Sequence, residues 1–98
     1  MDEALRRWIV ESSVAALIAD NVAVEMLPAA ACEDAHYPSH PLHDLCLFRL
    51  GVHLGELWHL SELADCLHAH GRNRFLLTAP PPRLPRAVGS PVTPVATV

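Results

Sequence analysis

Two short, nearly uninterrupted apolar runs limit the folds that are open to this chain. The first covers residues 14–19 and the second covers residues 75–79. Apolar runs of this length are typical of strands that are buried on both faces, although a buried helix segment gives the same pattern. Residues 2–12 come directly before the first run and read as a helix, with Asp2 as its N-cap. A helix followed directly by a buried strand predicts an α/β fold.

The middle of the chain adds two more helices and a strand. Residues 41–50 read as a helix that ends at Gly51, and residues 52–58 read as a short strand. Ser61 is placed to cap a third helix, and Gly71 is placed to stop it. With the two apolar runs, we therefore expect three short helices and three to four strands.

The C-terminal stretch has a different composition. Six of the nine prolines lie in residues 80–98. Such a stretch is either a disordered extension or, since proline is tolerated in edge strands, a tail that ends in a strand at residues 95–98. The chain has 98 residues, enough for one small domain or for a piece of a larger one.

Composition excludes several classes of function. The net charge is −4 and the seven basic residues are scattered arginines, so the sequence lacks the basic patch that is typical of nucleic-acid-binding proteins. It has no apolar run of the roughly 20 residues that cross a bilayer, and no signal-peptide pattern at its start. Three cysteines without a CxxC motif fit a reducing compartment. We expect a soluble, cytoplasmic protein.

His43 and Glu56 are the first candidates for metal ligands. If the chain reverses at Gly51, the helix after His43 rises about 10 Å. The strand that leads to Glu56 then returns about 13 Å, so the two side chains end nearly level. An imidazole beside a carboxylate suits Zn²⁺ or Mn²⁺. The alternative is that Glu56 pairs with Arg49 or lies at the solvated end of the strand.

Asp20 and Asn21 are candidates for substrate binding. They close the first apolar run, and ligands of open α/β sheets tend to bind beyond the carboxyl ends of strands. Equally, the two residues could serve only to make the turn and bind local backbone groups. The spacing does not separate these alternatives.

Two further constellations around His43 have simpler interpretations. His36, His40 and His43 have a spacing that a helix would bring to one face, but prolines between them favour a solvated loop. Cys46 lies three residues after His43, which allows a cysteine–histidine nucleophile pair. Its apolar neighbours favour a buried, inert thiol instead.

The run from His43 to Trp58 resembles a C-terminal segment of the cyclase family, the group of metal-dependent hydrolases that includes kynurenine formamidases. In that family a histidine opens a short helix, and a glutamate follows a Leu-Gly turn and strand. His43 and Glu56 are the positions that match. The likeness continues in four further stretches, residues 14–21, 60–66, 71–77 and 89–96.

The resemblance implies a mixed α/β structure with a barrel-like sheet, of which this chain supplies part. It also implies a divalent metal, Zn²⁺ or Mn²⁺, with His43 and Glu56 among its ligands. The implied reaction is attack of a metal-activated water on an amide, formamide or lactone-type carbonyl of a small molecule. Members of the family commonly form oligomers, so the resemblance also implies a homo-oligomer.

One departure from the family pattern concerns its principal ligands. These lie in an N-terminal His-x-Gly-Thr-His-x-Asp motif, and this sequence contains no Gly-Thr. We therefore expect either a longer protein that supplies the missing N-terminal portion or a truncated relative without catalysis that binds a partner chain. A small stand-alone metal-binding module built on the histidine cluster is a third hypothesis.

Overall fold

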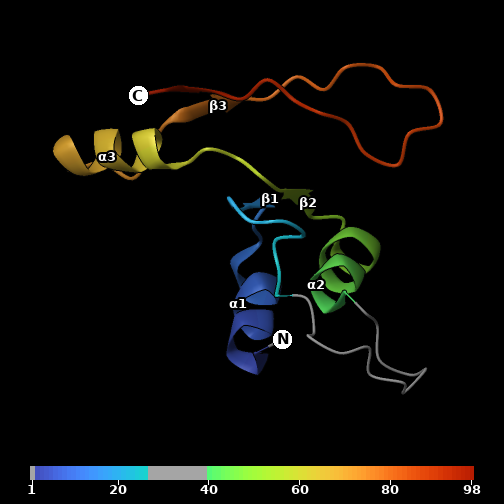
Figure 1. Ribbon diagram of the computed structural model, residues 1–98. Coiled ribbons are helices and arrows are strands. Elements are labelled where there is room, and N and C mark those ends of the chain that lie inside the picture. Colours follow the sequence, from blue (N-terminus) through green and yellow to red (C-terminus); the bar gives the residue numbers. More distant parts are fainter. Residues whose placement is uncertain (1, 27–39) are drawn as a thin grey trace. The chain divides into compact units, whose positions relative to one another are not determined.

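The computed structural model describes residues 2–26 and 40–98. The chain falls into two compact units, Met1–Leu60 and Ser61–Val98. The described residues form three helical segments and four short strands (Figure 1). The predicted mixed α/β class is thus confirmed.

The first unit begins with helix α1, Glu3–Ser12. The Asp2 carboxylate accepts hydrogen bonds from the backbone N–H groups of Ala4 at 2.7 Å and Leu5 at 3.1 Å. These bonds satisfy two of the N–H groups that a helix start leaves open. The helix ends where Ser13 turns into the left-handed conformation (φ 55°). The predicted helix and its cap are confirmed.

Two parallel strands form within the predicted segments 14–19 and 52–58. Strand β1, Ala16–Ile18, pairs with β2, His53–Gly55, with Leu17 opposite Leu54. The prediction that β1 is buried on both faces is wrong for this unit. Ala16 is exposed, and the other two residues of β1 are only half-buried, because the sheet has just two strands within the described residues.

The helix predicted over 41–50 is present but changes its hydrogen bonding along its length. Helix α2, Pro41–His43, runs directly into a π-helical segment, η1, Asp44–Leu50. Gly51 ends it with φ +68°, and its N–H donates to the carbonyl of Cys46. A pattern of apolar side chains does not distinguish i→i+4 from i→i+5 bonding, so the sequence could not predict the π segment. Such segments are rare and are often found at functional sites.

The core of the first unit joins its two helices. Figure 1 shows α1 and α2 side by side below the β1–β2 pair. The buried cluster lies between these elements and consists of Ile9, Leu42, Leu45, Cys46 and Val52. Ile9 and Cys46 have almost no exposed surface, at 1% and 0%.

The second unit pairs a helix with a hairpin-like strand pair. Helix α3, Ser61–Ala69, comes first, and strand β3, Leu76–Thr78, is antiparallel to β4, Val95–Thr97. The tail therefore ends in a strand, which decides between the two alternatives for residues 80–98. The expectation that 75–79 is buried is wrong for the described structure, because β3 has β4 as its sole strand partner there and all three of its residues are exposed.

None of the helices in residues 2–26 and 40–98 has the length and apolar character needed to cross a membrane.

Candidate functional site

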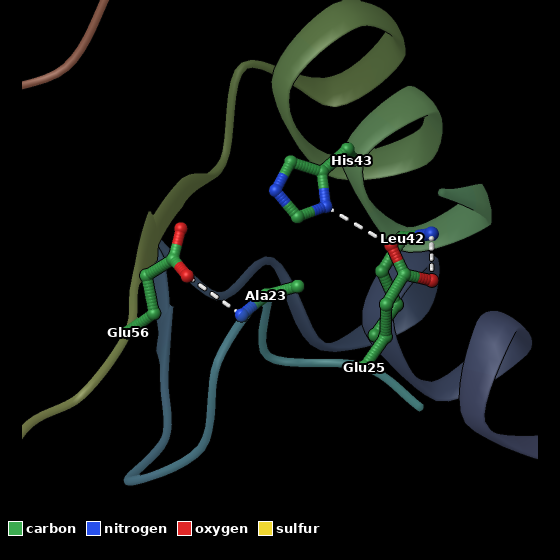
Figure 2. Close-up of polar contacts among 5 residues, drawn as sticks. All are labelled: Ala23, Glu25, Leu42, His43 and Glu56. Carbon is green, nitrogen blue, oxygen red and sulfur yellow. Dashed lines mark hydrogen bonds and ion pairs between the residues drawn. The ribbon is translucent and has the colours of Figure 1, made fainter. Parts of the chain in front are cut away.

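A short segment, residues 23–25, links the two predicted metal ligands to the rest of the first unit. At one end, the Glu56 carboxylate accepts a hydrogen bond from the backbone N–H of Ala23 at 2.6 Å. At the other end, the Glu25 carboxylate meets Nδ1 of His43 at 2.9 Å. Figure 2 shows these contacts and, in that view, the His43 ring between the two glutamates. The structure thus brings His43 and Glu56 to the same short segment.

The backbone of this segment is strained. Ala23 and Val24 both have positive φ, at 64° and 60°. For a β-branched residue such as Val24 this conformation is a genuine outlier, and each such residue costs about 1–3 kcal/mol. The hydrogen bonds at Ala23 and Glu25 fix both ends of the segment. Strain of this kind persists only where surrounding contacts hold it, and it is concentrated at functional sites.

Glu25 is the buried member of the pair of glutamates. Its side chain is 6% exposed, whereas Glu56 is exposed. One Glu25 oxygen accepts the backbone N–H of Leu42 at 2.9 Å, and the other meets His43. A buried carboxylate is stable only when hydrogen-bond donors surround it, and here two donors do so.

The contact with Glu25 defines the chemistry of the His43 imidazole. An ionised carboxylate only accepts hydrogen bonds, so Nδ1 of His43 can bond to an ionised Glu25 only as the donor. In the neutral ring, Nε2 then holds a lone pair, which suits a metal ligand or a general base. The His43 side chain is 30% exposed, and the His40 ring lies edge-on to it with the ring centroids 5.2 Å apart.

Asp20 and Asn21 lie beyond the carboxyl end of β1. Because β1 and β2 are parallel and end at register partners, Ile18 and Gly55, the residues that follow each strand leave the same edge of the sheet. Glu56 therefore shares this edge with Asp20 and Asn21. Both residues are exposed.

The backbone of Asn21 has a clear structural role. Its carbonyl accepts a hydrogen bond from the N–H of Leu57 at 3.2 Å, one of several bonds that extend the contact between the two strands. This contact supports the alternative that the pair mainly makes the turn. A role of Asp20 and Asn21 in substrate binding stays a prediction.

The predicted metal ligands fit a divalent cation in kind but are too few. An imidazole nitrogen and a carboxylate oxygen are suitable donors for Zn²⁺ or Mn²⁺. Within residues 2–26 and 40–98, however, no group of three or more histidine, cysteine or acidic side chains is arranged to hold a metal ion. His36 lies outside the described residues. His43 and Glu56 would therefore supply only part of a ligand set.

The alternative partner for Glu56 is not observed. Arg49 binds the Asp44 carboxylate, with Nε 2.8 Å from Oδ2. Glu56 instead binds the backbone of Ala23. An Arg49–Glu56 pair is thus contradicted.

Cys46 has the properties of a buried, inert thiol. It is completely buried, and burial raises its pKa above the ordinary value, with a further upward contribution from the negative charge of Glu25. A thiolate is the nucleophilic form, so both influences make Cys46 less reactive. The structure therefore disfavours the cysteine–histidine nucleophile pair.

Glu25 is the residue of this site that was not predicted from the sequence. The sequence does carry one signal for it, because Glu25 is a lone carboxylate in an apolar stretch, after Val22-Ala23-Val24 and before Met26. Its partner lies 18 residues away, across residues 27–39, so no local spacing predicts the pair.

Comparison with solved structures finds a clear similarity. The chain is similar to a crystal structure described as that of a novel cyclase, with 39% identity over 99% of this chain and a TM-score of 0.81. This similarity supports the cyclase family that the run from His43 to Trp58 resembles. The chain spans 29% of the length of that cyclase chain. No protein-family model and no curated protein matches the sequence.

Proposed function

We propose that this chain is the C-terminal portion of a metal-dependent hydrolase of the cyclase family, similar to kynurenine formamidases. The similarity to the cyclase structure supports the proposal most strongly, because it extends along nearly the whole chain. In this proposal His43 and Glu56 contribute ligands to a divalent metal, Zn²⁺ or Mn²⁺. The remaining ligands come from the part of the cyclase fold that these residues do not span.

The proposed substrate class rests on the resemblance to this family. A divalent cation, when bound, makes a water molecule acidic and polarises a carbonyl, which suits hydrolysis of an amide, formamide or lactone-type bond. The residues of this chain have two tasks in the proposal. His43 presents one nitrogen while its other nitrogen is held by Glu25. In the proposal, Asp20 and Asn21 contact a small-molecule substrate; that they share a sheet edge with Glu56 supports this assignment.

The test is substitution of the two proposed ligands in the complete protein. We expect His43→Ala and Glu56→Ala to lower bound metal, measured by elemental analysis, and to lower turnover of formamide, amide or lactone substrates. Glu62→Gln, at an exposed position of α3, is the matched control and should change neither quantity. If both ligand variants retain full metal and full activity, the assignment of the site is wrong.

A second candidate function is association without catalysis. The observation that favours it is the exposed apolar surface of the first unit, which includes Val10, Leu47, Phe48 and Leu57 at 50–86% exposure. Such surface marks an interaction site, and each strand of the β1–β2 pair keeps one edge that no described strand covers. The partner in this alternative is either another copy of the chain or the missing portion of the same fold.

Sedimentation distinguishes a chain that associates with a partner from a chain that is stable as a monomer. If the isolated chain associates, it should sediment as an oligomer or bind the N-terminal portion of a cyclase supplied as a separate chain. A well-folded monomer that does not bind the added portion would contradict the association function.

A further inference from the structure

We propose that Glu25 is a positioning residue that fixes His43 in the tautomer with the proton on Nδ1, so that Nε2 is presented as a ligand atom. This inference rests on the proposed function, because it explains how His43 is prepared to bind a metal. It assigns a role to a residue that lies 31 positions before Glu56 and outside the motif that matches the cyclase family.

The first argument is the geometry of the Glu25 carboxylate. Its Oε2 accepts the N–H of Leu42 at 2.9 Å, and its Oε1 lies 2.9 Å from Nδ1 of His43. Both oxygens are therefore committed to neighbouring residues of one helix start. The side chain is 6% exposed, so water has little access to compete for these bonds.

The second argument is the direction in which each partner can bond. The backbone N–H of Leu42 can only donate, so it always requires an acceptor on Glu25. His43 can bond through Nδ1 either as donor or as acceptor, depending on its tautomer. A carboxylate at this position selects the donor form. Metal-binding histidines commonly have their other ring nitrogen held by a carboxylate or carbonyl in this way.

A second side chain, the imidazole of His40, also contacts the His43 ring. The His40 ring is edge-on to His43, with the centroids 5.2 Å apart. His40 and Glu25 approach His43 from different chain segments, so the imidazole is restricted by two contacts.

Glu25→Gln separates this role from simple stabilisation of the helix start. The amide oxygen of the introduced glutamine still accepts the Leu42 N–H, since the opposite orientation would bring two donors together. The amide NH₂ must then face Nδ1 of His43, which has to become an acceptor. The proton moves to Nε2, and the nitrogen proposed as metal ligand is blocked until the tautomer is reversed.

The decisive measurement is the tautomer of His43 in the metal-free protein, read from long-range ¹H–¹⁵N correlation spectra at about pH 8, where an ordinary imidazole is neutral. We expect the Nδ1–H form in the unsubstituted chain and in the control Glu62→Gln. We expect the Nε2–H form in Glu25→Gln. An Nδ1–H form that persists in Glu25→Gln would overturn the proposal.

Circular dichroism shows whether each variant is folded, and Glu25→Asp is a second test if Glu25→Gln fails to fold. The introduced aspartate keeps a carboxylate but is shorter by one methylene, so His43 should lose the fixed Nδ1–H form and show a mixture of tautomers. A single Nδ1–H form in folded Glu25→Asp would count against positioning by Glu25.

Zinc affinity then tests the proposed function separately. In the complete protein, competition with a chromogenic chelator should show a dissociation constant raised about 10–100-fold by Glu25→Gln and unchanged by Glu62→Gln. If the tautomer changes but zinc affinity does not, His43 is not a ligand and the proposed function fails. The two results thus identify which of the two claims is wrong.

Discussion

Glu56 and Ala23, 33 residues apart in sequence, are joined by a hydrogen bond of 2.6 Å between the carboxylate and the backbone N–H. The bond holds Ala23 in its left-handed conformation (φ 64°) beside the carboxyl end of β2. Glu56 therefore has a structural task that does not depend on any metal. A substitution at Glu56 therefore affects this hydrogen bond as well as the proposed metal binding, unless the variant is chosen to separate the two.

Comparison of Glu56→Gln with Glu56→Ala separates the contribution of the Ala23 hydrogen bond from the proposed metal binding. Glutamine keeps an oxygen that accepts the Ala23 N–H, whereas alanine leaves this buried group without its bond. We expect Glu56→Ala to lower the free energy of unfolding by about 1 kcal/mol, since the lost bond involves an exposed carboxylate. Glu56→Gln should cost clearly less. Urea denaturation followed by circular dichroism measures both.

The control for this pair is Glu62→Ala on α3, where no such bond is present among the described contacts. It should leave stability within about 0.5 kcal/mol of the unsubstituted chain. Equal stability of Glu56→Ala and Glu62→Ala would show that the Ala23 bond contributes nothing.

Gly51 is needed for its backbone conformation and not for lack of space. Its φ is +68°, and a Cβ placed there would meet no atom within 4 Å. Gly51→Ala should therefore destabilise the chain by about 1–2 kcal/mol through left-handed strain alone. Gly51→Asn should cost less, because asparagine tolerates this conformation. Thermal unfolding of the two variants gives the comparison.

A matched glycine is available in the second unit. Gly89 also has open space around it, and its φ lies outside the left-handed region. Gly89→Ala should be neutral or slightly stabilising, since alanine restricts the unfolded chain. A loss of stability at Gly89 equal to that at Gly51 would refute the conformational explanation.

Ile9 is the side chain of α1 that the core depends on. It is 1% exposed, whereas its neighbour Val10 is 50% exposed. We expect Ile9→Val to lower the free energy of unfolding by about 0.5–1.5 kcal/mol, through the loss of one buried methylene. Val10→Ala removes more atoms but should stay within about 0.5 kcal/mol, because they are largely solvated. Similar losses in the two variants would mean that α1 does not pack as described.

Much of the fold was predictable because its signals are local. The cap at Asp2, the helix end at Gly51 and the strands in the apolar runs each depend on only a few neighbouring residues. All three features are found at the predicted positions. Burial was predicted less well, since the runs at 14–19 and 75–79 were expected to lie inside a sheet. Each lies in a sheet of two strands in the described chain, and the number of strands in a sheet is a long-range property.

The site was predictable in part for the same reason. His43 and Glu56 drew notice through the length of the helix and strand between them. Glu25 did not, because its contact with His43 forms across residues 27–39, whose length and composition carry no information on where the chain returns. The left-handed backbone at Val24 was equally unpredictable, since valine ordinarily avoids it.

Cys46 makes the stability of the first unit depend on alkaline pH. Burial, and then the charge of Glu25, raise the pKa of this thiol above its ordinary value of 9.0. The folded chain therefore binds the Cys46 proton more tightly than the unfolded chain does. The resulting stabilisation is complete below about pH 9 and is lost as pH rises through the higher pKa of the folded state.

The variant that tests this dependence is Cys46→Ala, measured by urea denaturation between about pH 7 and pH 10.5. At pH 7 it should be less stable by about 1–2 kcal/mol, because a buried atom is lost. Above pH 9 its stability should fall less steeply than that of the unsubstituted chain, since the thiol no longer titrates. Cys66→Ala retains Cys46, so it should keep the original slope. Parallel curves for Cys46→Ala and the unsubstituted chain would contradict the raised pKa, because the alkaline loss would then come from other groups.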